Sequence, residues 1–284
     1  MQYERASYEL PQSTLECTED FSKYNGEGTL LRKVQMRSLE ILVEFDRICR
    51  KHNIPYWLDC GTLLGAVRHN GFIPWDDDVD VAMPYKYIKK LRKVMKEELS
   101  PRFAYQDIST DKNYYLESVI KIRDKKSYFP IEVYKGFKEQ GILLDVVPVE
   151  QISLPLKKFV MKVNKYPYLR KKEISMYGKT QYPIIGTLLT PLAEMVKSFA
   201  HWYSKDKGTT DWRYNYTYIF QGHELYPFKH EWLFPLKEAE FEGHLFPVPY
   251  DAVAVLKNFY GEDALEIPPT SKRTTHSPNV QFYD

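Results

Sequence analysis

Four aspartates cluster in the segment 72–83, and the last two are separated by a single valine. Asp76, Asp77, Asp78 and Asp80 follow an Ile-Pro-Trp sequence. In a strand, Asp78 and Asp80 share one face, where two carboxylates about 6–7 Å apart repel each other unless a cation lies between them. Mg²⁺ beside a phosphate suits such oxygen ligands, with Mn²⁺ as a second choice. A solvated acidic turn is the competing interpretation. The interleaved valines and the apolar lead-in favour a metal-binding site.

A third carboxylate lies in an apolar run downstream. Asp145 interrupts the predicted strand 142–149, and a buried lone carboxylate is costly unless it is paired or metal-bound. We therefore predict that Asp78, Asp80 and Asp145 are metal ligands and catalytic residues. The competing interpretation of Asp145 is an ion pair with Lys121 or Arg123. Asp77 is also a candidate catalytic residue, because it could orient the ligands or receive a proton from an acceptor hydroxyl.

A Gly61-Thr62 pair precedes these aspartates at a predicted strand-to-helix junction, between a strand at 56–60 and a helix at 62–68. Free backbone N–H groups at a helix start can bind phosphate oxygens, glycine allows close approach, and the threonine hydroxyl adds a donor. We expect Gly61 and Thr62 to bind substrate.

Further candidate substrate-binding residues are basic or aromatic. Arg68 can bind a phosphate bidentately, although an ordinary surface arginine fits equally well. Trp75 either belongs to the core or walls the site. Lys121 and Arg123, two apart on a predicted strand, share a face and could balance phosphate charge.

The segments GTLLGAVRH (61–69) and FIPWDDDVD (72–80) closely resemble the signature of the LicD family. This family belongs to the nucleotidyltransferase superfamily and is related to the fukutin proteins. The resemblance continues in KIRD (121–124) and LDVVP (144–148), with weaker matches after position 240 and at Arg273 and His276. The spacer before Asp-x-Asp is somewhat longer than usual in the superfamily, and threonine replaces the commoner serine.

The resemblance implies a transferase that moves phosphocholine from CDP-choline to a sugar hydroxyl and releases CMP. The implied acceptor is a cell-surface glycan, such as a teichoic acid, capsule or lipopolysaccharide precursor, free or lipid-linked. CDP-ribitol or CDP-glycerol could replace CDP-choline as the donor. Two rival functions are a non-catalytic glycan-binding module of this fold and a nucleotidyltransferase that uses an NTP. Trp212, Tyr214 and Tyr216 are candidates to hold a quaternary ammonium.

Composition restricts the class of protein. The net charge of +2 gives no reason to expect nucleic acid as a partner. Three widely spaced cysteines form neither a disulfide framework nor a zinc site. Without a visible secretory signal or an uninterrupted apolar run of spanning length, we expect a cytoplasmic protein, with peripheral contact at the inner membrane face as a further expectation.

The order of predicted elements indicates an α/β (α+β) fold, with a nucleotidyltransferase-like mixed sheet, a mainly helical insertion and a C-terminal extension. Helices are predicted at 29–52, 84–99, 182–203 and 250–260, and further strands at 103–106, 118–123 and 128–134, the last forming a hairpin with 142–149. The expected divisions are an N-terminal arm (1–28), a catalytic core (29–150), a basic and aromatic insertion (151–230) and a segment that packs on the core (231–284).

Residues 154–182 are rich in lysine and arginine, with apolar and aromatic residues between them. A solvated helix face is one interpretation. A basic amphipathic surface that touches anionic lipid or a lipid-linked glycan is the other.

Overall fold

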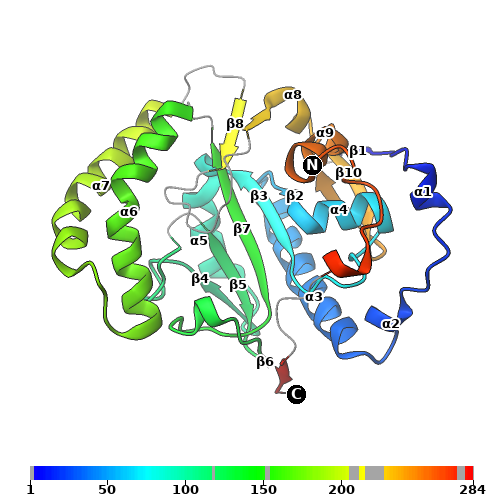
Figure 1. The fold of residues 1–284 in the computed structure, drawn as a ribbon, viewed down its shortest axis with the longest axis horizontal. Coiled ribbons are helices and arrows are strands. Elements are labelled where there is room, and N and C mark those ends of the chain that lie inside the picture. The colour runs from blue at the N-terminus through cyan, green and yellow to red at the C-terminus, as the bar shows by residue number, and fades with distance from the viewer. Residues whose placement is uncertain are drawn as a thin grey trace.

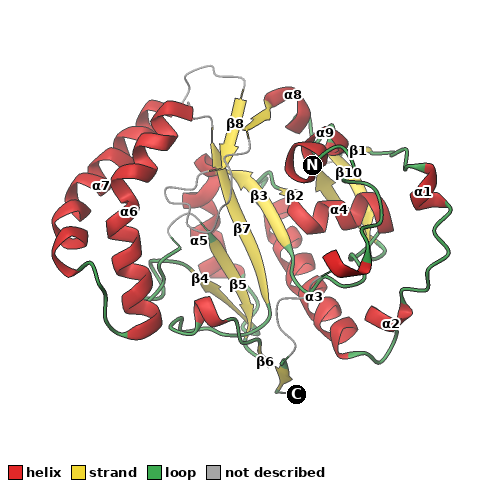
Figure 2. Cartoon of the chain, viewed as in Figure 1, coloured by secondary structure: helices red, strands yellow, loops and turns green. Residues whose placement is uncertain are grey.

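A seven-stranded mixed sheet forms the centre of the molecule (Figures 1 and 2). The computed structural model describes residues 3–116, 119–150, 154–204, 211–214, 227–273 and 279–283. The strand order is β2-β3-β7-β5-β4, and β8 joins β7 to β9. In this sheet β3 and β7 pair in parallel, and the other pairs of described strands are antiparallel. The strands are β2 (Trp57–Leu58), β3 (Asp80–Pro84), β4 (Phe103–Gln106), β5 (Ile120–Asp124), β7 (Leu143–Glu150), β8 (Asp211–Tyr214) and β9 (Pro227–Lys229). The predicted α/β class with a mixed sheet is confirmed.

The long helix α3 (Leu30–Lys51) packs against β5 and β7, with α5 (Ile88–Glu98) beside it. Its buried stripe includes Leu42, Phe45 and Ile48, as the periodicity predicts, and Thr29 caps its N-terminus by accepting from the N–H of Arg32. The 3₁₀ turn η1 (Tyr85–Tyr87) precedes α5.

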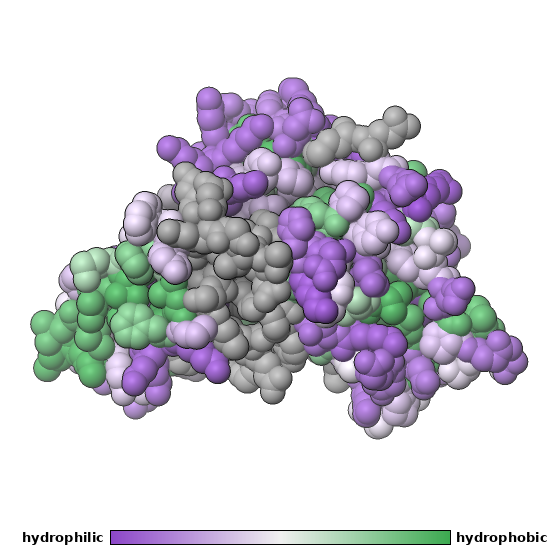
Figure 3. All heavy atoms as spheres, turned by 90° about the horizontal axis from the view of Figure 1, so that it is seen from above, coloured by the Kyte–Doolittle hydropathy of each residue, from purple (hydrophilic) through white to green (hydrophobic). Residues whose placement is uncertain are grey.

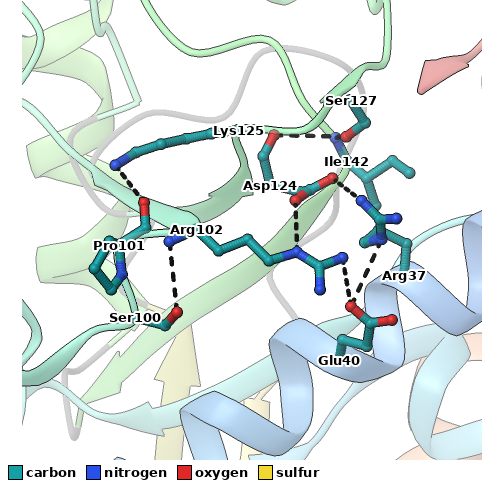
Figure 4. A network of polar contacts seen from close by, with 9 residues as sticks. All are labelled: Arg37, Glu40, Ser100, Pro101, Arg102, Asp124, Lys125, Ser127 and Ile142. Carbon is teal, nitrogen blue, oxygen red and sulfur yellow. Dashed lines mark hydrogen bonds and ion pairs between the residues drawn. The ribbon is translucent and has the colours of Figure 1, made fainter. Parts of the chain in front are cut away.

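Charged side chains also fix α3 to the sheet. The buried carboxylate of Asp124 accepts hydrogen bonds from Arg37 on α3 at 2.8 Å and from Arg102 at 3.4 Å, as Figure 4 shows. The N–H of Ile142 donates to Ser127, which places the start of β7 against the turn after β5. Asp124 of the KIRD segment thus has a structural role.

The predicted hairpin between 128–134 and 142–149 is wrong. The short β6 (Ser127–Tyr128) pairs with β12 (Gln281–Phe282), and the 3₁₀ turn η2 (Glu132–Tyr134) follows it. β7 pairs instead with β3 and β5 on its two sides. An apolar strand such as β7 is suited to a central position, where strand partners from distant parts of the chain occupy both edges.

Two long helices, α6 (Leu154–Tyr177) and α7 (Pro183–Ser204), pack together at one end of the molecule (left in Figure 1). A separate aromatic cluster joins α6 to the rest of the chain: Tyr168 packs with Tyr114, Tyr115 and Phe137. The predicted helix at 182–203 is confirmed.

A smaller sheet and short helices complete the fold on the opposite side (Figure 2). The sheet has the order β1-β10-β11, and α9 packs on α4 (Cys60–His69). The remaining elements are β1 (Glu4–Arg5), α1 (Gln12–Leu15), α2 (Ser22–Asn25), α8 (His230–Leu233), β10 (Lys237–Phe241), β11 (His244–Val248), α9 (Ala252–Tyr260) and η3 (Thr270–Lys272). The domain boundaries predicted from the sequence stay a prediction.

Candidate active site

A row of four polar side chains crosses the central sheet in register. Asp80 on β3 is the partner of Asp145 on β7, Asp145 is the partner of Lys121 on β5, and Lys121 is the partner of Gln106 on β4. Neighbouring strands lie about 4.8 Å apart, and residues in register point to the same face of a sheet. This polar row therefore brings two of the predicted metal ligands together from strands that are 65 residues apart in the sequence.

The backbone of Asp80 is held from two sides. Its N–H donates to the hydroxyl of Thr62 at 2.9 Å, and its carbonyl accepts from the N–H of Asp59 at 3.0 Å. The preceding residue is bound to β7, because the N–H of Asp145 donates to the carbonyl of Val79 at 2.8 Å. The position of the Asp80 carboxylate is thus set by the start of α4 and by β7.

Asp78 lies outside the strand that was predicted to carry it. β3 begins at Asp80, so Asp78 belongs to the loop that leads into β3. The pattern of alternating carboxylates predicted a longer strand, but of this pair Asp80 alone is in the ladder with β7. Asp78 is nevertheless close, because its charge is among those that raise the pKa of Asp80.

Carboxylates are concentrated around Asp80. Burial raises the pKa of Asp80 well above its ordinary value, and the negative charges of Asp78, Asp145, Asp59 and Asp76 raise it further. A cation bound nearby would lower the pKa of this carboxylate and so stabilise its ionised form. The electrostatics favour the binding of a positively charged ligand at this place.

The polar row contains its own cation. Lys121 is fully buried, and its Nζ lies 2.6 and 2.7 Å from the two carboxylate oxygens of Asp145. Burial lowers the pKa of Lys121, while Asp145 opposes that shift. The sequence left open whether Asp145 binds a metal or pairs with Lys121, and the structure shows the ion pair. Since a carboxylate offers about four lone-pair sites, the pair leaves Asp145 able to accept a further ligand.

The predicted turn at Gly61-Thr62 is already helical. α4 begins at Cys60, whose φ of 45° is in the left-handed region, so Gly61 and Thr62 form its first turn. A Cβ atom at Gly61 would lie 2.6 Å from a carboxylate oxygen of Asp76, so the Asp76 side chain approaches the start of α4 closely at this glycine. The helix start therefore faces the aspartate-rich loop, as a phosphate-binding role requires, while the Thr62 hydroxyl already accepts from Asp80. Substrate binding by Gly61 and Thr62 stays a prediction.

Arg68 is directed to the C-terminal segment. Its Nη1 donates to the carbonyl of Glu266 at 2.7 Å and its Nε lies 3.0 Å from Nε2 of His69. Burial lowers the pKa of Arg68 to about 10. These contacts fix the C-terminal segment to α4, so a phosphate contact by Arg68 would require it to exchange a carbonyl partner.

Trp75 is a core residue that the N- and C-terminal segments cover. It is buried, and the Arg273 guanidinium lies 4.5 Å from the centre of its ring. Arg273 also forms a bidentate ion pair with Glu19, at 2.7 and 2.8 Å. Of the two interpretations of Trp75, packing is the one that the contacts support. Arg273 joins the two ends of the chain, and His276 lies outside the described residues.

The two remaining predicted site residues are buried. The guanidinium of Arg123 donates to the carbonyl of Gly141 at 2.8 Å and to Gln106 at 3.3 Å, so it supports the polar row from the side. Asp77 is 2% exposed, and its N–H lies 3.2 Å from a carboxylate oxygen of Asp76. The catalytic role suggested for Asp77 stays a prediction.

Two residues that contribute to the site are not among those predicted from the sequence. The first is Tyr134 in η2, which lies over Lys121, with the lysine Nζ 4.2 Å from the ring centre. Burial raises the pKa of Tyr134, and the charges of Asp145, Asp78 and Asp80 add to the rise. The sequence pattern assigns Tyr134 to a strand, and only the long-range packing reveals its position.

Gln35 on α3 is the second of these residues. It is fully buried and donates to the carbonyls of Ile73 and Asp76 at 3.3 and 2.9 Å. A buried glutamine on an apolar helix face was the available signal, since such an amide must find partners. The contact fixes the loop that carries the aspartates.

Magnesium suits the chemistry of this site. Within the described ranges, no three His, Cys, Asp or Glu side chains form a ready metal-binding group. Mg²⁺ is usually held by one or two carboxylates together with substrate phosphates, so a complete protein cage is not required. The negative charges gathered around Asp80 are of the kind that a divalent cation would neutralise.

The part of the chain that forms this site resembles known proteins. Residues 53–145, which contain the aspartate-rich loop and both members of the acidic pair, match the family described as LicD/FKTN/FKRP, nucleotidyltransferase domain. The resemblance to the LicD family is thus confirmed for this segment of the chain. The match ends at Asp145 and includes all three predicted metal ligands.

Individual relatives extend the similarity. The chain is 28% identical over 257 residues to the lipopolysaccharide cholinephosphotransferase LicD of Haemophilus influenzae, which covers 87% of this chain and 95% of that protein. A stretch of 30 residues is 57% identical to the human and mouse ribitol 5-phosphate transferase FKRP, covering 11% of this chain and 6% of those proteins. The mannosyltransferase regulator 4 of Saccharomyces cerevisiae is 29% identical over 68 residues, 24% of this chain and 6% of that protein.

Proposed function

We propose that this protein is a Mg²⁺-dependent transferase that moves phosphocholine from CDP-choline to a sugar hydroxyl of a cell-surface glycan and releases CMP. The observation that carries the proposal is the register of Asp80 with Asp145, beside Asp78 and in line with Lys121. The printed name of the Haemophilus relative, a lipopolysaccharide cholinephosphotransferase of nearly equal extent, supports phosphocholine as the transferred group.

Asp78, Asp80 and Asp145 would hold the metal ion together with phosphate oxygens of the substrate, since these side chains alone form no ready metal-binding group. When bound, Mg²⁺ would neutralise the diphosphate and stabilise the charge that develops on the departing CMP. Lys121 would hold the Asp145 carboxylate in place, because its ammonium contacts both carboxylate oxygens. The N–H groups at the start of α4, at Gly61 and Thr62, would receive phosphate oxygens.

The acceptor hydroxyl would attack the phosphorus distal to the cytidine and form the new phosphodiester bond. The bond from that phosphorus to the bridging oxygen then breaks, and CMP leaves with the electron pair. The hydroxyl proton must be accepted by a base, for which Asp77 and the partly exposed Asp76 are the candidates from the loop. The aromatic candidates for the ammonium group, Trp212 and Tyr214, lie on β8 and Tyr216 lies outside the described residues.

The direct test is ³¹P NMR of the full chain with CDP-choline, Mg²⁺ and a glycan acceptor. We expect release of CMP that stops when EDTA is added. Asp80→Asn should lower the rate by about 10²–10³-fold, as loss of a transition-state electrostatic contact does. Asp20→Asn, at an exposed carboxylate in the N-terminal arm, is the matched control and should keep the wild-type rate.

Parallel reactions with CDP-ribitol and CDP-glycerol identify the donor. The short stretch shared with a ribitol 5-phosphate transferase makes CDP-ribitol the first of these donors to compare. Absence of CMP with every CDP-alcohol, or an unchanged rate in Asp80→Asn, would refute the proposed chemistry. Release of pyrophosphate from an NTP would instead identify a nucleotidyltransferase.

A further inference from the structure

The outward face of α7 is an apolar stripe. Ile184, Leu188, Met195 and Trp202 are 74, 72, 63 and 67% exposed. Leu192 and Phe199 fill the positions between them and are also exposed. Steps of three and four residues place all six on one side of a helix. Figure 3 shows hydrophobic surface gathered at the end of the molecule formed by α6 and α7.

The other side of α7 is committed to packing. Ala193 and Ala200 are buried, and Ala200 belongs to a small cluster with Val160 on α6. The helices approach closely at Gly186, where a Cβ atom would lie 2.7 Å from the Cβ of Arg170. α7 is thus held with its stripe outward, and contiguous exposed apolar surface of this kind marks an interaction site.

The helical hairpin that carries the stripe is positively charged. Residues 154–204 contain nine lysines and arginines and two glutamates, a net charge of +7 in a chain whose total is +2. Lys158, Lys162 and Lys165 on α6 are exposed. Of the two glutamates, Glu194 pairs with Lys197 at 2.7 Å. Hydrophilic surface borders the apolar area in Figure 3.

We propose that the α6–α7 hairpin docks the protein on the surface of an anionic lipid bilayer, with the α7 stripe inserted among the lipids and the net positive charge of the hairpin attracting it to the anionic headgroups. α7 is 22 residues, about 33 Å, of continuous helix along which apolar insertion can occur. Trp202 and Tyr203 at its end are residue types that prefer the membrane interface. Within the described part of the chain, no helix is long and apolar enough to cross a membrane.

Charge favours lipid over a second copy of the chain. Two such hairpins facing each other would bring two segments of +7 together, whereas anionic headgroups attract each of them. The docking is independent of the transferase chemistry. It would also place the sheet near the membrane, because His201 on α7 stacks on Tyr85, one residue after β3, with ring centres 4.2 Å apart.

The test is co-sedimentation of the full chain with phosphatidylcholine vesicles and with vesicles that contain phosphatidylglycerol. We expect binding to the anionic vesicles only, weakened by salt. Leu188→Ser and Met195→Ser should each weaken binding about tenfold, because each removes an inserted apolar side chain. Leu15→Ser, at a residue on α1 that is 63% exposed, is the matched control and should bind like the wild type.

A second measurement reports directly on whether the stripe enters the lipid. Brominated lipids should quench the fluorescence of the wild type, and Trp202→Phe should lose that quenching. Absence of wild-type binding to anionic vesicles, or equal binding by Leu188→Ser, would overturn the proposal. A concentration-dependent dimer that Leu188→Ser abolishes would assign the stripe to a second copy instead. Lysine-to-glutamine changes at 158, 162 and 165 that left vesicle binding unaltered would overturn the role of charge.

Discussion

Replacement of Lys121 by methionine should destabilise the protein far more than loss of an ordinary surface ion pair. Lys121 is fully buried, and its partner Asp145 is 19% exposed at the side chain. Removal of one partner from a buried pair leaves an uncompensated charge and costs about 3–5 kcal/mol. Methionine recovers part of the packing and Asp145 reaches some water, so we expect a loss of about 2–4 kcal/mol in the free energy of unfolding.

Urea denaturation at pH 7 in EDTA measures this loss, and Mg²⁺ refines it. Because the metal would replace the missing positive charge beside Asp145, added Mg²⁺ should stabilise Lys121→Met more than the wild type. Lys257→Met is the matched control: Lys257 pairs with Glu262 at 2.8 Å, but these side chains are 40 and 89% exposed. Such exposed pairs contribute about 0–1 kcal/mol. A loss in Lys121→Met no larger than in the control would refute the central role of the buried pair.

Three further perturbations test the surroundings of the site. Because the pKa of Asp80 is raised, the folded state binds the Asp80 proton more tightly than the unfolded chain does. The free energy of unfolding should therefore fall as the pH rises above the ordinary pKa of an aspartate. Asp80→Asn in EDTA should remove this part of the pH dependence. Burial and the charge of Arg68 lower the pKa of His69 to about 4. The neutral imidazole therefore stabilises the fold fully above about pH 6.5, and this stabilisation is lost as the pH falls toward 4. NMR titration should find the low pKa, and His69→Gln should flatten the fall in stability between these pH values. Thr62→Val leaves the N–H of Asp80 without its acceptor and should cost about 1–3 kcal/mol in thermal or urea unfolding, whereas Thr187→Val, at an exposed hydroxyl on α7, should change stability by less than about 0.5 kcal/mol.

Local patterns were sufficient to predict most helices and the strand that carries Asp145. The periodicity of α3 and the apolar run of β7 specify both elements, because each buries side chains at fixed spacing. Asp145 stood out as the single carboxylate in that run. These features depend on neighbours in the sequence, and the structure confirms where they lie.

Strand pairing could not be read from the sequence. Residues 128–134 have strand-like composition, yet Tyr134 lies in a 3₁₀ turn over Lys121, because β7 takes β3 and β5 as partners in place of the nearby segment. The same limit applies to Arg68 and Trp75, whose contacts come from the C-terminal segment almost 200 residues away. Tertiary packing overrides local preference at such positions.

Calorimetric titration of CDP-choline into the protein, with and without Mg²⁺, tests the central claim most directly. We expect binding that requires Mg²⁺ in the wild type and is lost in both Asp80→Asn and Asp145→Asn, while circular dichroism shows that both variants remain folded. Binding of equal strength without the metal, or in folded Asp80→Asn, would contradict the assignment of the acidic pair on β3 and β7 as the site that holds magnesium and the cytidine diphosphate ester.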